Sequence, residues 1–301
     1  MLTMTTASQP YILAPSPLSG LSLCYALASG ADAHEALRGL AAGFVPAWGT
    51  VGIGEPLTRA VGRQVPGLRP FPAMSAPGCG VPSTQQPLWI LVTAANQSGV
   101  FDIFRKVEAL TAEAFILTDS MPTFIYTEHR DLTGYEDGTE NPKGKAAATA
   151  ALVETGLGET GRGLAGSSFA AVQRWEHDLD HFNSHPEKVR DAMMGRRRRD
   201  NAELPRAPAT SHVKRSTQED YDPPAFMMRR SMPWATVWGQ GLEFIAYGRS
   251  LDAYERVMRR MAGLDDGIVD ASFAYSRPVT GGYYWCPPVR SGKLDLGFLG
   301  L

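Results

Sequence analysis

Apolar segments with strand-like and helix-like periodicity alternate along this chain, and the alternation recurs in its two halves. In the first half, short apolar runs suited to strands flank segments whose apolar residues recur at helical spacing. We expect strands at 21–28, 50–54, 88–94 and 115–120 and helices at 31–44 and 100–110. This order is typical of a ferredoxin-like α+β unit.

The second half repeats the pattern with longer insertions. We expect strands at 167–175, 241–248 and 281–286, and helices at 177–184 and 186–195, broken at Pro186, and at 250–263. The sequence therefore predicts an α+β fold in which two ferredoxin-like units pack antiparallel sheets together, as in dimeric α+β barrels.

The stretches between these segments set the expected boundaries. Residues 62–87 are rich in Pro and Gly and predict an irregular loop, and residues 195–225 form a long polar loop. Residues 144–168 are rich in Gly and Ala and are the best candidate for a boundary or a surface excursion. A length of 301 residues suits two units, which we expect at 1–150 and 151–301.

Composition excludes several classes of protein. Hydrophobic residues make up 44% and charged residues 20%, which excludes wholesale disorder, and a net charge of −2 argues against a basic nucleic-acid binder. The three cysteines have no metal-ligand spacing, so a reducing compartment is favoured over a disulfide scaffold. No apolar run is long enough to span a bilayer, and the N-terminal residues lack the features of a secretory signal. We therefore expect a soluble cytoplasmic protein with no nucleic-acid or membrane partner.

The segment GYEDGTENPKG, residues 134–144, is the sharpest local feature. Gly, Asp, Asn and Pro are the usual residues of turns, so a plain turn is one interpretation. In the functional interpretation, Gly134 and Gly138 let the backbone pass close to a flat ligand. Asp137 would then project into the ligand's pocket as a proton shuttle.

Two further features admit more than one interpretation. His177 and His181 have the spacing of one helix face and could chelate zinc, but interleaved acids favour a solvated helix. Residues 190–230 hold ten Lys or Arg against six Asp or Glu, including the run Arg196–Arg199. Such a run could bind nucleic acid, but a solvated loop is the simpler interpretation.

Together with other blocks, GYEDGTENP resembles the GxxDG motif of the dye-decolourising peroxidases, which are haem enzymes. The supporting blocks, in the family's order, are GLRPFPAM, VQRWEHDLDHFN, MGRRRRDNAEL, SHV, RRSMPW, GLEFIAYGRS and PVTGGYYWCPP. The resemblance covers roughly residues 10–290 and is strongest to the compact B-type branch. It outweighs the plain-turn interpretation of residues 134–144.

The resemblance implies a b-type haem and assigns residues to each side of it. Of the chain's six histidines, His212 matches the proximal iron ligand. Arg196 matches a propionate-binding arginine, whose planar guanidinium suits a carboxylate. The motif places Gly138, Thr139 and Glu140 beside the cofactor, on the N-terminal unit, and the C-terminal unit carries the iron ligand and the distal arginine.

On the distal side, the resemblance implies that Asp137 moves a proton and that Arg229 stabilises negative charge on the departing oxygen. Without the other blocks, a surface arginine would be the better interpretation of Arg229. Ser231 stands where B-type relatives usually carry an asparagine, and we include it among the catalytic candidates.

A second departure concerns the partner of the proximal histidine. The family often has an aspartate near Ala274, but the segment here reads FAYS and has no acid. A backbone carbonyl or Asp270 could substitute as the acceptor.

The implied function is a haem peroxidase that takes hydrogen peroxide and a reducing organic donor, such as a dye or a phenol. Ser231 and the missing acid favour an alternative, a haem-binding or haem-handling protein with little peroxidase activity. We also expect a homo-oligomer, while no segment of the sequence identifies an encapsulating shell as partner.

Overall fold

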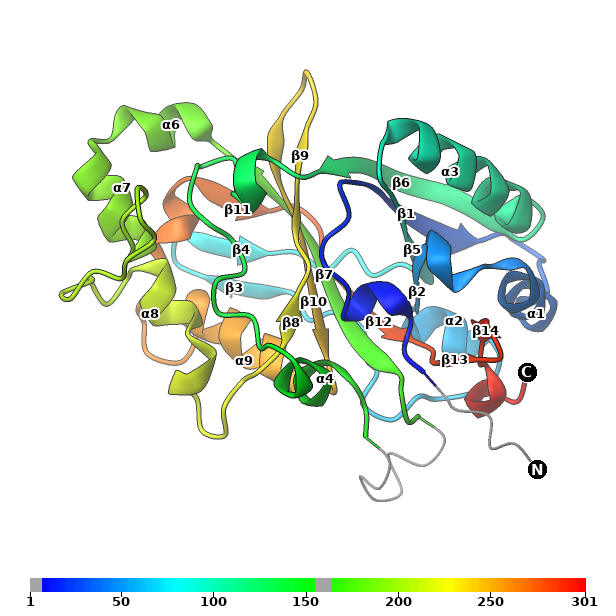
Figure 1. Ribbon diagram of the computed structural model, residues 1–301. Helices are drawn as coiled ribbons and strands as arrows, with labels where there is room; N and C mark the ends of the chain where they lie inside the picture. The colour runs from blue at the N-terminus through cyan, green and yellow to red at the C-terminus, as the bar shows by residue number, and fades with distance from the viewer. Residues whose placement is uncertain (1–6, 155–163) are drawn as a thin grey trace.

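One antiparallel sheet of ten strands runs through the protein (Figure 1). The computed structural model describes residues 7–154 and 164–301. Along its main path the strand order is β6-β1-β5-β2-β12-β7-β10-β8, so each half of the chain supplies four neighbouring strands. Numbered within its half, each set has the order 4-1-3-2, which is the ferredoxin-like arrangement.

The first set holds the strands expected in the N-terminal half. It consists of β1 (Ser19–Leu27), β2 (Gly49–Ile53), β5 (Leu88–Ala94) and β6 (Phe115–Phe124). The helices α1 (Ala33–Gly43) and α3 (Gln97–Thr111) connect them, and the short α2 (Glu55–Ala60) follows β2. Helix α1 begins at Asp32, whose carboxylate accepts the backbone N–H groups of His34 and Glu35, as an N-cap should.

The second set holds β7 (Ser168–His177), β8 (Met228–Arg229), β10 (Gln240–Gly248) and β12 (Gly282–Cys286). Strand β9 (Met232–Ala235) pairs with β10, and β11 (Ser276–Pro278) pairs with the end of β7. Helix α9 (Asp252–Met261) buries four residues at helical spacing, namely Tyr254, Val257, Met258 and Met261. These side chains form part of the core beneath the site described below.

The two sets join at their edges and pack against each other. Strands β2 and β12 meet where Ile53 pairs with Trp285. In the core the rings of Trp89 and Tyr284 stack with centroids 5.7 Å apart. Arg174 of β7 links the sets again, since it pairs with Asp119 of β6 and with Glu243 of β10. The predicted α+β fold with two ferredoxin-like units is therefore confirmed.

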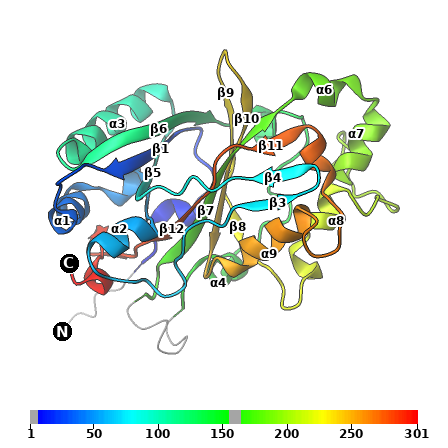
Figure 2. The same ribbon diagram turned by 180° about the vertical axis from the view of Figure 1, so that it is seen from behind.

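Two stretches are more regular than the sequence suggested. Within 62–87, which was expected to be irregular, β3 (Met74–Ala76) and β4 (Cys79–Val81) form a hairpin that lies near β11 (Figure 2). Within 144–168, α4 (Lys145–Ala151) buries Ala147, Ala150 and Ala151 against the second set. The alanines of α4 allow the helix to pack closely on the strands. Small residues are also common at domain boundaries, so the composition of this segment did not distinguish a boundary from a packed helix.

The long insertion after β7 builds one wall of the site. It contains α6 (Leu179–Ser184), α7 (Glu187–Met194) and α8 (His212–Ser216). Pro186 separates α6 from α7 as expected. The chain ends with the hairpin of β13 (Val289–Arg290) and β14 (Lys293–Leu294). No helix in residues 7–154 and 164–301 is long and apolar enough to cross a bilayer.

Candidate active site

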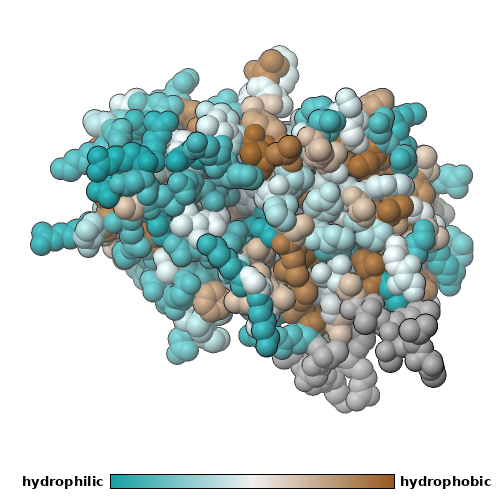
Figure 3. All heavy atoms as spheres, in the orientation of Figure 1, coloured by the Kyte–Doolittle hydropathy of each residue, from teal (hydrophilic) through white to brown (hydrophobic). Residues whose placement is uncertain are grey.

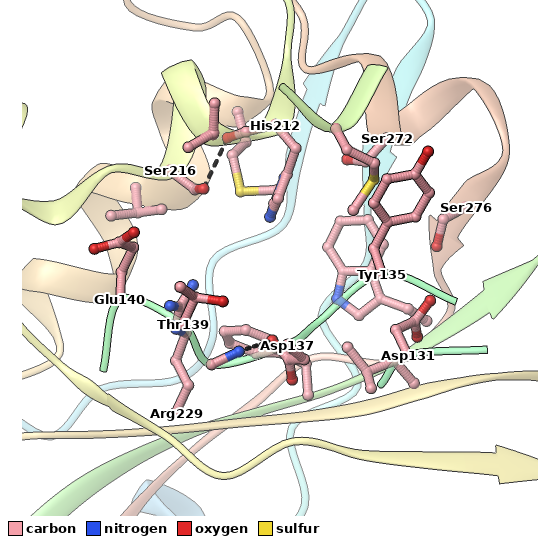
Figure 4. A pocket seen from close by; sticks show the side chains of 18 of the residues that line it. Asp131, Tyr135, Asp137, Thr139, Glu140, His212, Ser216, Arg229, Ser272 and Ser276 are labelled. Carbon is pink, nitrogen blue, oxygen red and sulfur yellow. Dashed lines mark hydrogen bonds between the residues drawn. The ribbon is translucent and has the colours of Figure 1, made fainter. Parts of the chain in front are cut away.

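A large cavity lies between the 134–144 loop, α8 and the face of the second set of strands (Figure 4). Its empty volume is about 1290 Å³, including space open to solvent. Much of its lining is apolar, contributed by Trp175, Leu242, Phe244, Val257, Met258 and Met261. A large apolar pocket with a few convergent polar groups is the usual form of a cofactor site.

His212 enters this main cavity as the first residue of α8 (Figure 4). Its Nδ1 lies 2.9 Å from Oδ2 of Asp270, a carboxylate that is fully buried. Nδ1–H therefore donates to Asp270, and the Nε2 lone pair is left available toward the cavity. Desolvation by itself lowers the pKa of His212, but the Asp270 carboxylate outweighs it and raises that pKa.

Asp270 is the carboxylate partner of His212, in place of the aspartate that the family often has near Ala274. Of the two substitute acceptors considered, a backbone carbonyl and Asp270, the structure shows Asp270, which lies four residues before Ala274 in the chain. Asp270 also accepts the backbone N–H of Ser272 at 2.8 Å and begins the short helical turn Ala271–Ala274. The backbone bond from Ala271 N–H to the Thr210 carbonyl holds the two segments together.

Asp137 lies on the opposite side of the cavity from His212 (Figure 4). Its loop turns at Gly134 and Gly138, with φ of +83° and +72°, a region that favours glycine. At Gly134, a side chain would also collide with the guanidinium of Arg198. Burial raises the pKa of Asp137 above its ordinary value, although the cation of Arg229 acts against the rise. A carboxyl with a raised pKa gains and loses its proton at a pH closer to neutral than an exposed carboxyl does.

Arg229 ends β8 and lines the cavity beside Asp137. Its Nε is buried and has no hydrogen-bond partner among the described residues. The side-chain amide of Asn141 fixes the backbone of Arg229, since Nδ2 donates to the Arg229 carbonyl and Oδ1 accepts the Arg229 N–H, each at 2.9 Å. This paired contact ties the Asp137 loop to the Arg229 strand.

The remaining cofactor-binding candidates line the same cavity. Arg196 forms an ion pair with Glu140, and its Nη1 donates to the Asn201 carbonyl at 3.1 Å. Thr139 accepts a hydrogen bond from the Asn201 side chain, and Gly138 lies at the turn of the loop. The structure therefore brings together His212, Arg196, Gly138, Thr139 and Glu140 with Asp137 and Arg229.

Ser231 is the one candidate outside the main cavity. It is buried, and its Oγ accepts the backbone N–H of Ile245 at 3.4 Å. It lines instead a second cavity that adjoins the first.

The suggestion of a zinc site at His177 and His181 is wrong. His177 ends strand β7, whereas His181 lies on α6, so the two do not share a helix face. Nε2 of His177 lies 3.1 Å from Asp131, and its Nδ1 lies 2.6 Å from the Ser276 hydroxyl. Among the described residues, no group of three His, Cys, Asp or Glu side chains is arranged to hold a metal.

Three of the four arginines in the run form ion pairs with nearby carboxylates. Arg197 and Arg199 pair with Asp200, and the Arg198 side chain covers Gly134. Only Arg196 of the run lines the main cavity.

Sequence reasoning missed two residues that shape the site, Asp131 and Asn141. Burial alone would raise the pKa of Asp131, but His177 and the hydrogen bonds from Thr133 keep it below its usual value. The partners of both residues are distant in sequence, 46 positions for His177 and 88 for Arg229. The only local signal was the position of Asn141 inside the GYEDGTENP block.

These side chains fit an iron porphyrin. One side offers an imidazole whose Nε2 has no described protein partner, and the other offers a buried guanidinium N–H without an acceptor. The apolar walls suit a flat hydrophobic ring, and Arg196 near the loop could meet a carboxylate. A fully buried carboxylate on a histidine ligand is a frequent arrangement at metal centres.

Comparison with known proteins agrees with this geometry. Residues 128–291 match the family model described as Dyp-type peroxidase, C-terminal. A dye-decolorizing peroxidase of Mycobacterium tuberculosis is 31% identical over 228 residues, covering 74% of this chain and 67% of that protein.

Solved structures are similar over almost the whole chain. DyPB from Rhodococcus jostii RHA1 superposes with a TM-score of 0.85 at 26% identity, covering 93% of this chain and 96% of its own. A dye-decolorizing protein from V. cholerae gives 0.82 at 27% identity, covering 96% and 98%. Variants of the Rhodococcus protein were solved in complex with heme. The chain therefore belongs to the Dyp-type peroxidase family of haem-dependent enzymes, with the B-type DyPB among its structural relatives.

Proposed function

We propose that this protein reduces hydrogen peroxide and oxidises dye-like or phenolic donors by one-electron steps, using a b-type haem bound in the main cavity. One observation carries the proposal. His212, backed by Asp270, faces Asp137 and Arg229 across a single large cavity. An axial ligand, a proton carrier and a cation are the groups that peroxide cleavage requires.

The residues that would hold the cofactor follow from their positions. His212 Nε2 would bind the iron, and Arg196 would meet a propionate in competition with Glu140, its present partner. The backbone at Gly138, with Thr139 and Glu140, would border the ring. When bound, the haem supplies the iron and the electrons that cleave the peroxide O–O bond.

The protein's own groups handle protons and charge. Asp137 would take a proton from one oxygen of the peroxide and return it to the departing oxygen. The raised pKa of Asp137 suits both steps. Arg229 stabilises the negative charge that develops on the departing oxygen.

The test is a spectrum followed by a turnover measurement. The purified protein should show a Soret band, and added peroxide should drive oxidation of an anthraquinone dye or a phenol. A Soret band without turnover would favour the haem-handling alternative, for which Ser231 remains the supporting feature. No Soret band after reconstitution with haem would contradict both functions.

Asn141 should act as a positioning residue for Arg229. Asn141→Leu removes both contacts to the Arg229 backbone, and we expect the peroxide reaction to slow by about tenfold or more, because small displacements of a catalytic group are costly. A double-mutant cycle checks the mechanism. In an Arg229→Leu background, Asn141→Leu should cause little further loss, whereas a purely structural role predicts the same loss in both backgrounds.

The raised pKa of Asp137 predicts a pH dependence. Only the ionised carboxylate accepts a proton, so the peroxide rate should fall as pH drops through a pKa above the ordinary aspartate value. Arg229, Asp131, His212 and the Gly138 N–H act on this carboxyl, and burial dominates their sum. Stopped-flow rates from pH 4 to 8 should show this acid limb in the wild type. Asp137→Asn should lose the limb, and an unchanged limb would contradict the assignment.

The same shift predicts the sign of an effect on stability. A carboxyl whose pKa is raised by folding destabilises the folded state once pH exceeds its unfolded value. Asp137→Asn should therefore raise the unfolding temperature at pH 7, and the gain should shrink toward pH 4.

We also propose a homo-oligomer. The edge strand β6 exposes Ile116 and Leu117, and the β9–β10 hairpin projects with exposed Val237 and Trp238 at its tip (Figures 1 and 3). Exposed apolar side chains on a sheet edge favour association. Light scattering at micromolar concentration should give a mass of two chains or more, and the mass of one chain would reject the proposal.

Two further parts of the proposal concern organisation and location. The division into 1–150 and 151–301 is supported by the four neighbouring strands that each part supplies. A cytoplasmic location is supported by the cysteines, which are free thiols. Burial raises the pKa of Cys24 to about 12 and that of Cys79 to about 11, so neither is poised to react.

A further inference from the structure

A second cavity adjoins the main cavity on the Arg229 side. Its empty volume is about 730 Å³, including open space, and it shares Asp137, Gly138 and Arg229 with the main cavity. Its other walls come mainly from the segment that follows β6, residues 125–131, from residues 15–16, and from Arg230 and Ser231. Arg230 has no part in the proposed peroxide reaction.

Arg230 is a cation without an anionic partner. Its Nη2 donates to the Leu13 carbonyl at 2.6 Å, but no carboxylate in residues 7–154 or 164–301 lies within ion-pair distance. Its Nε is buried and has no acceptor among those residues. Burial lowers the pKa of Arg230, as expected where the guanidinium charge has no compensating group.

The other charges on this cavity are compensated. Arg130 pairs with Glu128 and Glu136, and Asp131 pairs with His177. Asp137 and Arg229 act on each other electrostatically, and His129 is exposed. Of the arginines that line this cavity, Arg230 is therefore the one on which no described carboxylate acts.

A guanidinium carries five N–H donors, and one carbonyl satisfies only one of them. A buried donor without an acceptor lowers stability. The single hydrogen bond to the Leu13 carbonyl therefore does not explain why a charged residue stands here. A neutral donor would serve that purpose as well. An anion in the cavity would supply both the acceptor and the opposite charge.

We propose that the second cavity is a binding site for a small monovalent anion, such as a halide, nitrate or formate, held by the guanidinium of Arg230. The bound anion lies beside the Asp137–Arg229 pair, because the cavity shares both residues with the main cavity. If the protein has the proposed peroxidase function, the bound anion also affects catalysis. The anion competes with peroxide for the Arg229 side of the site, so it raises the peroxide KM in proportion to its concentration and leaves kcat unchanged.

The direct test uses crystals of the haem-loaded protein soaked in sodium bromide, with the bromide anomalous signal as readout. We expect a peak within hydrogen-bond distance of the Arg230 guanidinium in the wild type. Arg230→Met should lose the peak. Arg249→Met, which removes an exposed arginine outside both cavities, should keep it. No wild-type peak in the second cavity, or an undiminished peak in Arg230→Met, overturns the proposal.

A solution measurement covers the case in which Arg230→Met does not fold and distinguishes adventitious binding. Arg230→Gln keeps a donor for the Leu13 carbonyl but removes the charge. At constant ionic strength, bromide should raise the unfolding temperature of the wild type and not that of Arg230→Gln. An equal rise in both proteins means an adventitious ion only and overturns the proposal.

Kinetics then separate the site from the proposed function. The Soret band should not change with bromide, since a change shared by wild type and variant places the anion on the iron and overturns the proposal. A bromide peak in a protein without peroxide turnover rejects the proposed function and leaves the anion site standing. Turnover with a bromide-independent peroxide KM and no peak rejects the anion site alone.

Discussion

His212→Ala should lose most of its bound haem, or hold it so weakly that added imidazole changes the spectrum. The reason is that His212 presents its Nε2 to the cavity while Asp270 holds Nδ1–H. Removing a partner behind a ligand typically costs 10–100-fold in metal affinity, and we expect removal of the ligand itself to exceed about 100-fold. Haem titration of the reconstituted protein, followed at the Soret band, measures the change.

Two variants serve as controls for this prediction. Asp270→Asn keeps the ligand and weakens only its support, so its loss of affinity should be smaller, about 10–100-fold. His181→Ala alters a histidine on α6 that does not line the cavity, and it should bind haem like the wild type. If His212→Ala keeps the native spectrum and His177→Ala loses it, the ligand assignment is wrong.

The fold could be predicted because its signals are local. Strand β5 is a run of seven residues of which six are buried, and α9 repeats apolar residues at helical spacing. Both patterns are visible in the sequence without any knowledge of partners. The β3–β4 hairpin could not be predicted in this way, because its strands have three residues each and lie in a Pro- and Gly-rich stretch.

In the site, too, residues in local sequence blocks could be predicted, whereas contacts between distant residues could not. His212, Asp137 and Arg229 were named from blocks of neighbouring residues, and the structure places them around one cavity. The partner of His212 could not be fixed from sequence, because 58 residues separate it from Asp270 and three-dimensional contact decides the pairing. For His177, by contrast, a local spacing pattern led to a wrong prediction. Its spacing to His181 suggested a shared helix face, but β7 continues through His177, and its pairing with Ser276 of β11 favours the strand.

Arg229→Leu should slow the reaction with peroxide by about 10²–10³-fold while leaving haem content and the Soret band unchanged. The guanidinium has a buried N–H with no partner and forms no ion pair with a described carboxylate, so its hydrogen-bonding capacity is held for a group that enters the cavity. Ser231 is too short to replace an amide there and bonds to the backbone of Ile245. We therefore expect Arg229 to contribute more than Asp137.

The measurement is the stopped-flow rate at which peroxide changes the haem spectrum, in fully haem-loaded variants. Asp137→Ala should be slower chiefly above the raised pKa of Asp137, where the wild-type carboxylate is ionised and can accept the peroxide proton, and the two rates should converge at low pH. Arg229→Lys distinguishes the effect of the positive charge from that of the planar guanidinium, because lysine keeps the charge but lacks the planar group. Its rate should lie between those of Arg229→Leu and the wild type. Arg249→Met, which removes an exposed arginine, should react like the wild type. Unchanged rates in both Arg229→Leu and Asp137→Ala would place the distal chemistry on other residues, and the haem-handling alternative would then be preferred.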